Sequence, residues 1–285
     1  GDDLSALVQS ATEGTTFILA EGTHRMHSIV PKDGMTVRGS PGAVMSGARV
    51  LEGFESDGDH WRLNGIDQTG AIRGQCVGRY SGCEFSQDLF MDDVMLWQVT
   101  DIDDLDVGRW FWEGDTIYVA NDPASRRVEL SVTEHAFYGS ADDVTIANLV
   151  IEKYATPAQE GMVQAQDLGD GERGRRWLLA DLEITGSHGV GLRTGDATVV
   201  RNVHVHHNGQ MGIAVSGGTD VLLEDNEIAF NNIAGFDWTW EGGGMKATRT
   251  NGLIVRGNYT HDNIGPGLWT DIDAEDTLYE HNLVV

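Results

Sequence analysis

The sequence has 285 residues, of which 40% are hydrophobic and 22% charged, and its formal net charge is −26. Such a negative surface repels nucleic acid phosphates and anionic membranes, so we expect no nucleic-acid-binding role. No stretch approaches the roughly 18 apolar residues that a membrane-spanning helix needs, and we therefore expect no insertion into a bilayer.

The first predicted element is a short amphipathic helix over residues 3–12. Asp2 or Asp3 is suited to cap its N-terminus, and Gly14 is suited to end it. One side of the helix carries the apolar residues Leu4, Leu7 and Val8. Short strands are then expected at Thr16–Leu19, Ser28–Val30, Met35–Arg38 and Val44–Ser46.

Two cysteines, Cys76 and Cys83, lie in a segment that lacks any repeat, residues 51–140. Secreted proteins pair such cysteines, and the glycines between them allow the backbone to turn, so a disulfide is one prediction. Two buried thiols are the alternative. No nearby Cys/His pair completes a zinc site. We interpret residues 51–140 as a β-rich insertion or as irregular coils.

Short apolar strands recur in the second half of the sequence, each followed by a residue that suits a corner. These corner residues are Asn148, Asp181, Asn202, Asp225, Gly257 and His281. The spacing indicates a repeat of roughly 21 to 32 residues. The two longer steps contain insertions, at about 155–176 and 236–250.

A second strand, preceded by glycine, recurs within each repeat. It covers Gly189–Leu192, Gly212–Val215, Gly243–Lys246 and Gly265–Leu268. One such coil cannot bury its inward side chains alone, but coils stacked about 4.8 Å apart share a continuous core. The repeat therefore predicts an all-β, single-stranded parallel β-helix, with the N-terminal helix covering the first coil. Candidates for a hydrogen-bonded ladder along the stack are Asn226, Asn258 and Asn282.

The Gly-x-Gly-apolar and Val-x-Ile-x-x-Asn strands resemble those of the pectate-lyase-like superfamily of right-handed β-helix repeat proteins. The resemblance covers residues 141–285 and 14–50. From the residues we expect an N-terminal cap with the first coils over 1–50, a β-rich insertion or irregular coils over 51–140, and regular coils over 141–285. The superfamily includes polysaccharide lyases, glycoside hydrolases, epimerases and non-catalytic adhesins, and the outer face of one sheet commonly binds polysaccharide. A polysaccharide is therefore the expected partner.

Polar and aromatic residues are densest over residues 237–273. Stacking should bring Glu241 and Lys246 close to Trp269 and Asp271, which follow about one coil later. The candidate catalytic residues are Lys246, Glu241, His261, Asp271 and Asp237. The candidate substrate-binding residues are Arg193, His207, Trp238, Trp240, Arg249, Trp269 and Asp273.

Two mechanisms fit these residues. In β-elimination a base removes the C5 proton of a uronic acid while a cation neutralises the carboxylate. Lys246 resembles the catalytic lysine of the chondroitinase and alginate lyase branch, although Trp269 stands where that branch has an arginine. Ca²⁺ is a candidate cofactor for this route, held by Asp237 or Glu241. In hydrolysis, paired carboxylates act directly. They would come from Glu241, Asp237, Asp271 and Asp273.

The alternative to an enzyme is a non-catalytic carbohydrate-binding or adhesin-type surface protein. In that case Lys246 simply pairs with Glu241 or Asp271 on a solvated face. We expect an extracellular or cell-surface location, although no signal peptide is visible. Because the sequence stops in mid-strand at Leu283-Val284-Val285, a further domain or chain is expected to cover the C-terminal coil.

Overall fold

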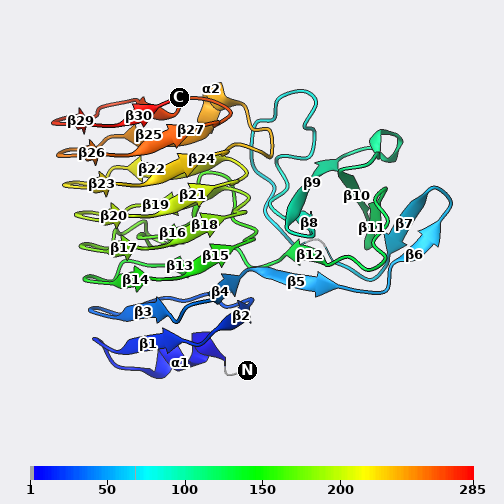
Figure 1. Cartoon of the computed structure of the whole chain (residues 1–285), viewed down its shortest axis with the longest axis horizontal. Helices are drawn as coiled ribbons and strands as arrows, with labels where there is room; N and C mark the ends of the chain where they lie inside the picture. Colours follow the sequence, from blue (N-terminus) through cyan, green and yellow to red (C-terminus); the bar gives the residue numbers. More distant parts are fainter. Residues whose placement is uncertain (1–2, 68) are drawn as a thin grey trace.

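The computed structural model describes residues 3–67 and 69–285, and its main body is a stack of coils (Figure 1). Each complete coil passes through three parallel sheets in turn. The first sheet contains β1 (Thr16–Leu19), β3 (Thr36–Gly39), β14 (Thr145–Ala147), β17 (Leu178–Ala180), β20 (Val199–Arg201), β23 (Leu222–Glu224), β26 (Ile254–Arg256) and β29 (Leu278–Glu280). The second contains β2 (Gly22–Arg25), β4 (Ala43–Ser46), β15 (Val150–Glu152), β18 (Glu183–Thr185), β21 (His204–His206), β24 (Glu227–Ala229), β27 (Tyr259–His261) and β30 (Leu283–Val284). The third contains β13 (Phe137–Tyr138), β16 (Gly161–Gln164), β19 (Val190–Arg193), β22 (Met211–Ser216), β25 (Gly243–Thr248) and β28 (Leu268–Thr270).

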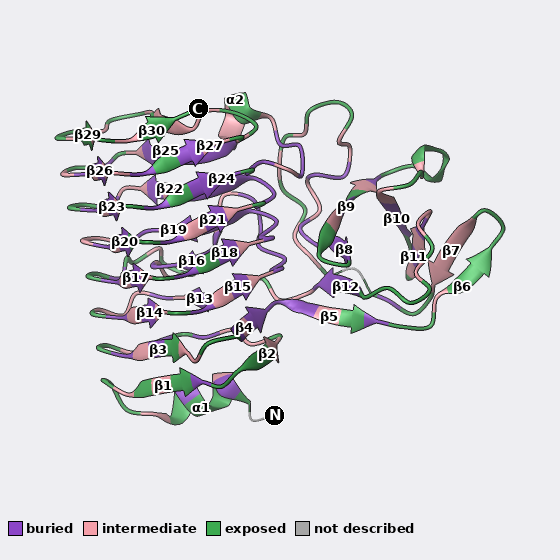
Figure 2. Ribbon diagram, viewed as in Figure 1, coloured by how far each residue is buried: buried purple, intermediate pink, exposed green. Residues whose placement is uncertain are grey.

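The core runs along the axis of this stack, as Figure 2 shows by the buried colour of the inward strand positions. In the first sheet the central residue of each strand stacks on the next. These residues are Ile146, Leu179, Val200, Leu223 and Val255, all fully buried. Each buried aliphatic side chain contributes roughly 1.5–3 kcal/mol relative to exposure. Because a single coil offers one such layer per sheet, stability depends on the stacking.

The corners between the first and second sheets explain the Asn, Asp and Gly pattern of the sequence. All six predicted corner residues have a positive φ, for example 55° at Asn148 and 66° at Gly257. Asn, Asp and Gly tolerate this left-handed region better than other residues. The predicted ladder is confirmed, because Asn226 Nδ2 donates to Asn258 Oδ1 over 2.9 Å and Asn258 Nδ2 donates to Asn282 Oδ1 over 3.0 Å.

A short helix, α1 (Leu4–Ser10), covers the first coil, and the Asp3 carboxylate caps it by accepting from the Ala6 amide. Leu4 and Val8 are buried in the core. Leu7, which was expected beside them, is instead 46% exposed, because only a narrow stripe of so short a helix faces the coil. Of the predicted early strands, Ser28–Val30 is reduced to a single bridge from Ile29 to Phe137. Among the described residues no helix is long and apolar enough to cross a membrane.

The chain leaves the stack after β4 and returns at β13, and the intervening segment forms a separate, mostly antiparallel sheet beside the β-helix (Figure 1). This lateral sheet contains β5 (Ala48–Leu51), β6 (Glu55–Asp57), β7 (His60–Leu63), β8 (Leu89–Met91), β9 (Val94–Val99), β10 (Arg109–Glu113), β11 (Thr116–Val119) and β12 (Val128–Ser131), with a 3₁₀ turn at Ile102–Asp104. It has its own hydrophobic core, in which Trp110 and Ile117 are fully buried. The fold is therefore a parallel β-helix with a capping helix and a β-rich insertion, as predicted.

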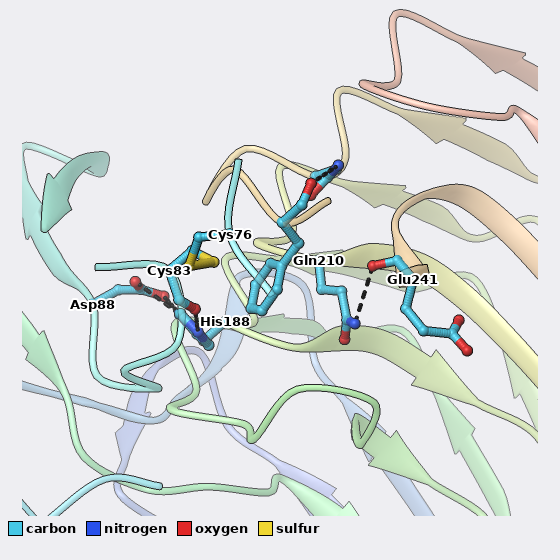
Figure 3. The surroundings of a disulfide bond; sticks show 8 residues. Cys76, Cys83, Asp88, His188, Gln210 and Glu241 are labelled. Atoms are coloured by element: carbon cyan, nitrogen blue, oxygen red, sulfur yellow. Dashed lines mark hydrogen bonds and ion pairs between the residues drawn. A yellow bond between two sulfur atoms is a disulfide. The ribbon is translucent and has the colours of Figure 1, made fainter. Parts of the chain in front are cut away.

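Buried polar contacts attach the lateral sheet to the coils. Lys153, in the corner after β15, donates to the buried Glu129 carboxylate of β12 over 2.5 Å and also pairs with Asp93. His188, which precedes β19, contacts the Asp88 carboxylate over 3.0 Å through Nδ1 and the Cys83 carbonyl over 2.9 Å through Nε2 (Figure 3). Polar groups this deeply buried are stable only with partners, so these contacts fix the orientation of the insertion.

Candidate functional site

The site is organised by one row of outward side chains on the third sheet. Strand pairing places Gln164, Arg193, Ala214, Lys246 and Trp269 opposite one another on successive coils. Side chains alternate along a strand, and the neighbours of Lys246 at 245 and 247 are buried in the core. Lys246 must therefore project outward. The small Ala214 occupies the position between Arg193 and Lys246.

Lys246 is held between two carboxylates. Its Nζ lies 3.1 Å from Glu241 Oε1 and 3.0 Å from Asp271 Oδ2, and it sits 3.9 Å from the centre of the Trp269 ring. Since both oxygens contact one ammonium group, they are at most about 6 Å apart, close to the separation found in carboxylate-dependent glycosidases. The predicted neighbourhood of Glu241, Lys246, Trp269 and Asp271 is thus what the structure contains.

Glu241 reaches this position from a short helix, α2 (Trp238–Glu241), which lies in the second of the predicted insertions. The helix begins at Asp237, whose carboxylate accepts hydrogen bonds from both the amide and the hydroxyl of Thr239. At the other end, Gln210 Nε2 donates to the Glu241 carbonyl over 3.1 Å (Figure 3). Both ends of the helix are therefore held, and the Glu241 side chain is directed toward Lys246.

The carboxylates open into a cavity of about 540 Å³ over the outer face of the third sheet. Its floor contains Arg193, Ala214 and Lys246 of the row described above, whereas Trp269 is not part of the lining. One wall is the loop from Gln164 to Gly171, which belongs to the first predicted insertion. A further wall includes Arg73, from the segment that precedes the lateral sheet strand β8. The lining is predominantly polar and charged, unlike the mostly apolar lining of most small-molecule pockets. The candidates Arg193 and Arg249 line this cavity together with Lys246.

Two cations of the cavity, Arg249 and Arg193, have no ion pair among the described residues, and Arg193 is the less exposed of them. Its Nη1 donates to the Gln159 carbonyl over 2.6 Å, whereas its buried Nε has no hydrogen-bond partner. Burial lowers the pKa of its guanidinium, although Glu160 and Glu241 oppose this effect at longer range. Among the described residues no carboxylate lies within 4.0 Å of it.

Three predicted residues lie near α2 but do not line the cavity. Asp237 acts as the helix cap, and hydrogen bonds from Thr239 lower the pKa of its exposed carboxyl group. Trp240 packs against Phe236 in a small cluster next to the disulfide, with ring centres 6.3 Å apart. Trp238 is 49% exposed. The Trp269 ring alone among the three predicted tryptophans is therefore placed beside the carboxylate pair.

The predicted histidines lie on the second sheet and not in the cavity. His261 Nε2 is 3.0 Å from Glu227 and its Nδ1 is 2.8 Å from Asp262, and both contacts raise its pKa, the Asp262 hydrogen bond most. His207 occupies a corner with φ of 50° and stacks on Phe230. Asp273, with the same φ, lies in the turn after β28 and is likewise absent from the cavity lining.

The predicted Ca²⁺ ligands do not fit a metal site. Within residues 3–67 and 69–285, no three His, Cys, Asp or Glu side chains are placed so that they could hold a metal ion. The Asp237 carboxylate is occupied by helix capping, and the Glu241 carboxylate is paired with Lys246. We therefore derive no step through a metal.

Sequence reasoning missed the residues that complete the cavity wall. Gln159, Glu160 and Gln210 lie outside the repeated strand positions, and Arg73 lies in the segment without a repeat. Arg73 is brought close by the loop that contains the Cys76–Cys83 disulfide, which resolves the choice left open between a disulfide and two thiols (Figure 3). The one available signal was the excess length of the coil around 155–176, whose extra residues form the wall.

Comparison with known proteins supports the architecture. Residues 170–285 match the family model described as "Right handed beta helix region". The fold of the chain is a right-handed parallel β-helix. A search of curated proteins found no match.

Two solved structures show how far this likeness extends. XylC, solved in complex with xylose, is 18% identical, with a TM-score of 0.85 over 99% of this chain and 58% of that chain. The A-module of the mannuronan C-5 epimerase AlgE6 from Azotobacter vinelandii is 12% identical, with a TM-score of 0.51 over 98% of this chain and 60% of that one. The chain thus spans less than two thirds of either structure. At these identities the likeness concerns the fold alone.

Proposed function

We propose that the protein is a glycoside hydrolase that acts on a polysaccharide, with Glu241 and Asp271 as its pair of catalytic carboxyl groups. The observation that carries the proposal is the placement of these two side chains on either side of Lys246, facing a polar cavity. One carboxyl group of such a pair acts as the general acid, and the other acts as nucleophile or base. Their separation of at most about 6 Å favours direct attack by a carboxylate on the sugar.

Several features of the cavity support a sugar substrate. The cavity is lined mainly by polar and charged side chains, and the Trp269 ring lies outside this lining, against Lys246. The amide side chains of Gln164, Gln166 and Gln210 line the same space and can exchange hydrogen bonds with hydroxyl groups. Two proteins of similar fold carry sugar-related names, XylC with bound xylose and a mannuronan C-5 epimerase, which agrees with this substrate class.

Hydrolysis is favoured over elimination because of the state of Lys246. Its two ion pairs and its contact with the Trp269 ring all require a positively charged ammonium group. A lysine that removes a C5 proton must be neutral before it acts, and these contacts would have to be given up. In our proposal Lys246 is a positioning residue, which holds the two carboxylates at a fixed separation.

We also propose that the protein works outside the cell. The Cys76–Cys83 disulfide supports this location, because such bonds persist in oxidising compartments and are rare in the cytosol. A polysaccharide is the partner that such a location and such a cavity suit best.

The test is hydrolysis of a panel of polysaccharides and aryl glycosides by the wild type, Glu241→Gln and Asp271→Asn. We expect both variants to lose at least a hundredfold in kcat. A matched control is Glu224→Gln, which removes a carboxylate paired with arginines on the first sheet, away from the cavity, and should keep full activity. Azide rescue of Glu241→Ala and Asp271→Ala on an aryl glycoside should assign the two roles. The variant without the nucleophile should give a glycosyl azide of inverted configuration, and the variant without the acid/base a glycosyl azide of retained configuration.

The outcomes separate the candidate functions. Release of reducing sugars without unsaturated products supports hydrolysis, whereas unsaturated products support elimination. Glycan binding without turnover in any assay would establish the adhesin-type alternative. Equal activity in wild type, Glu241→Gln and Asp271→Asn would show that this cavity is not the catalytic site.

A further inference from the structure

Arg193 differs from the two buried lysines of the chain. Acidic residues outnumber basic ones by 45 to 19, and Lys153 and Lys246 are each paired with carboxylates. They contact three and two carboxylates respectively. Arg193 lines the cavity with no carboxylate within 4.0 Å among the described residues, and its buried Nε has no partner.

An unpaired buried cation is costly to a fold, so such a group usually has a partner. The two nearest carboxylates are already engaged. Glu160 contacts His135 over 3.0 Å and Arg73 over 3.8 Å, and Glu241 contacts Lys246. The protein therefore contains a cation whose charge no group of the cavity neutralises by direct contact.

The Arg193 side chain is also fixed in position before any ligand binds. Its Nη1 donates to the Gln159 carbonyl, and its stem passes directly over Gly161, where an added Cβ would lie 2.8 Å from the Arg193 Cβ. A guanidinium fixed in this way presents its remaining N–H groups as a planar fork, the geometry that matches a carboxylate. Less conformational freedom is then lost when an anion binds.

From these observations we infer that Arg193 binds the carboxylate of an acidic sugar, so that the substrate contains uronic acid units. The inference rests on the proposed role in glycan processing and specifies its substrate class. Arg193 and Lys246 belong to one row, with the small Ala214 between them, and two strand spacings separate them by about 10 Å. The acidic ring at Arg193 is therefore the one next to the bond that lies over Glu241 and Asp271.

The test compares matched sugars that differ in one group: D-glucuronate with D-glucose, and D-galacturonate with D-galactose. Affinities are measured by calorimetry or ligand-observed NMR for wild type, Arg193→Gln and Arg256→Gln. Arg256 is a suitable control because it pairs with Glu224 and Glu280 on the first sheet. We expect wild type and Arg256→Gln to bind the uronates at least tenfold more tightly than the neutral sugars, and Arg193→Gln to lose this preference.

A second readout excludes a merely structural role. Added uronate should raise the melting temperature of the wild type and leave that of Arg193→Gln unchanged, whatever the stability of the unliganded variant. No preference in the wild type, or an equal preference in Arg193→Gln, would overturn the inference. If the Glu241 and Asp271 variants lose hydrolysis but the preference for uronates does not depend on Arg193, the proposed function is supported and the uronate site is refuted. If uronate binding depends on Arg193 but no polysaccharide is hydrolysed, the uronate site is supported and the proposed hydrolase function is refuted.

Discussion

The asparagine ladder between the first and second sheets gives a sharp test of what holds the coils together. Asn258 is 1% exposed, and its Nδ2 donates to the Leu223 carbonyl over 2.9 Å and to the Asn282 side chain over 3.0 Å. Its Oδ1 accepts from the amide and the side chain of Asn226. Replacement by Ala leaves several buried donors and acceptors without partners, each costing about 1–3 kcal/mol.

Because the freed groups share one cavity and water can partly satisfy them, the losses do not add fully. We expect Asn258→Ala to lower the free energy of unfolding of the C-terminal coils by about 3–5 kcal/mol. Native-state hydrogen exchange is the appropriate assay, because a stacked repeat opens locally and the protection of each strand reports its own stability.

The effect should be confined to neighbouring coils. Amides of β23, β26 and β29 should lose protection in Asn258→Ala, while those of β14 and β17 should keep it. Asn202→Ala is a control from the exposed part of a corner, where the side chain donates to Asp181, and it should cost about 1 kcal/mol. A loss below about 1 kcal/mol in Asn258→Ala, or an equal loss over all coils, would refute the reasoning.

Three further predictions concern attachment, protonation and cross-linking. Lys153→Met should weaken the attachment of the lateral sheet by about 3–5 kcal/mol, because it leaves the buried Glu129 and its neighbours short of one cation, and limited proteolysis should then cut near β12. NMR titration should place the pKa of His261 above 6.5, and Asp262→Asn should lower it. Since this pKa is raised in the folded state, the protonated ring stabilises the fold fully below the pKa of the unfolded chain, and this contribution is lost as the pH rises through the folded value. Replacing Cys76 and Cys83 by Ser should lower stability by about 2 kcal/mol, measured as a drop in melting temperature, because the short closed loop no longer restricts the unfolded chain.

The repeated part of the fold could be predicted from the sequence because each coil obeys the same local rules. The apolar central residue of every first-sheet strand and the Asn, Asp or Gly at its corner recur in register, and both have a direct physical cause in stacking and in positive φ. The same register predicted the meeting of Lys246 and Trp269, which pair on neighbouring strands. The second ladder, Asn208–Asn231–Asn263, was missed, although its side chains are linked over 2.9 Å as in the first.

Predictions failed where a residue was assigned a role from its chemical type alone, without regard to the sheet on which it lies. His261 was grouped with Lys246 because both lie in the polar run over residues 237–273, and His207 was a further candidate. Both belong instead to the second sheet and its corner. In a β-helix a few residues along the chain carry a side chain around a corner to a different face. Closeness in sequence therefore predicts poorly which side chains share a face of the β-helix. A separation of one full coil predicts it better.

The cavity itself arises where the coils depart from their regular length. Regular coils place Arg193, Ala214 and Lys246 on an open, nearly flat face, and such a face cannot exclude water from a reacting bond. The loop after β16 and the helix α2 rise from this face at two different coils, and the segment that contains Arg73 adds a third wall from the insertion. The stack thus fixes the positions of the charged groups, and the irregular segments supply the enclosure, so substitutions in the loops should alter substrate choice more readily than they alter the fold.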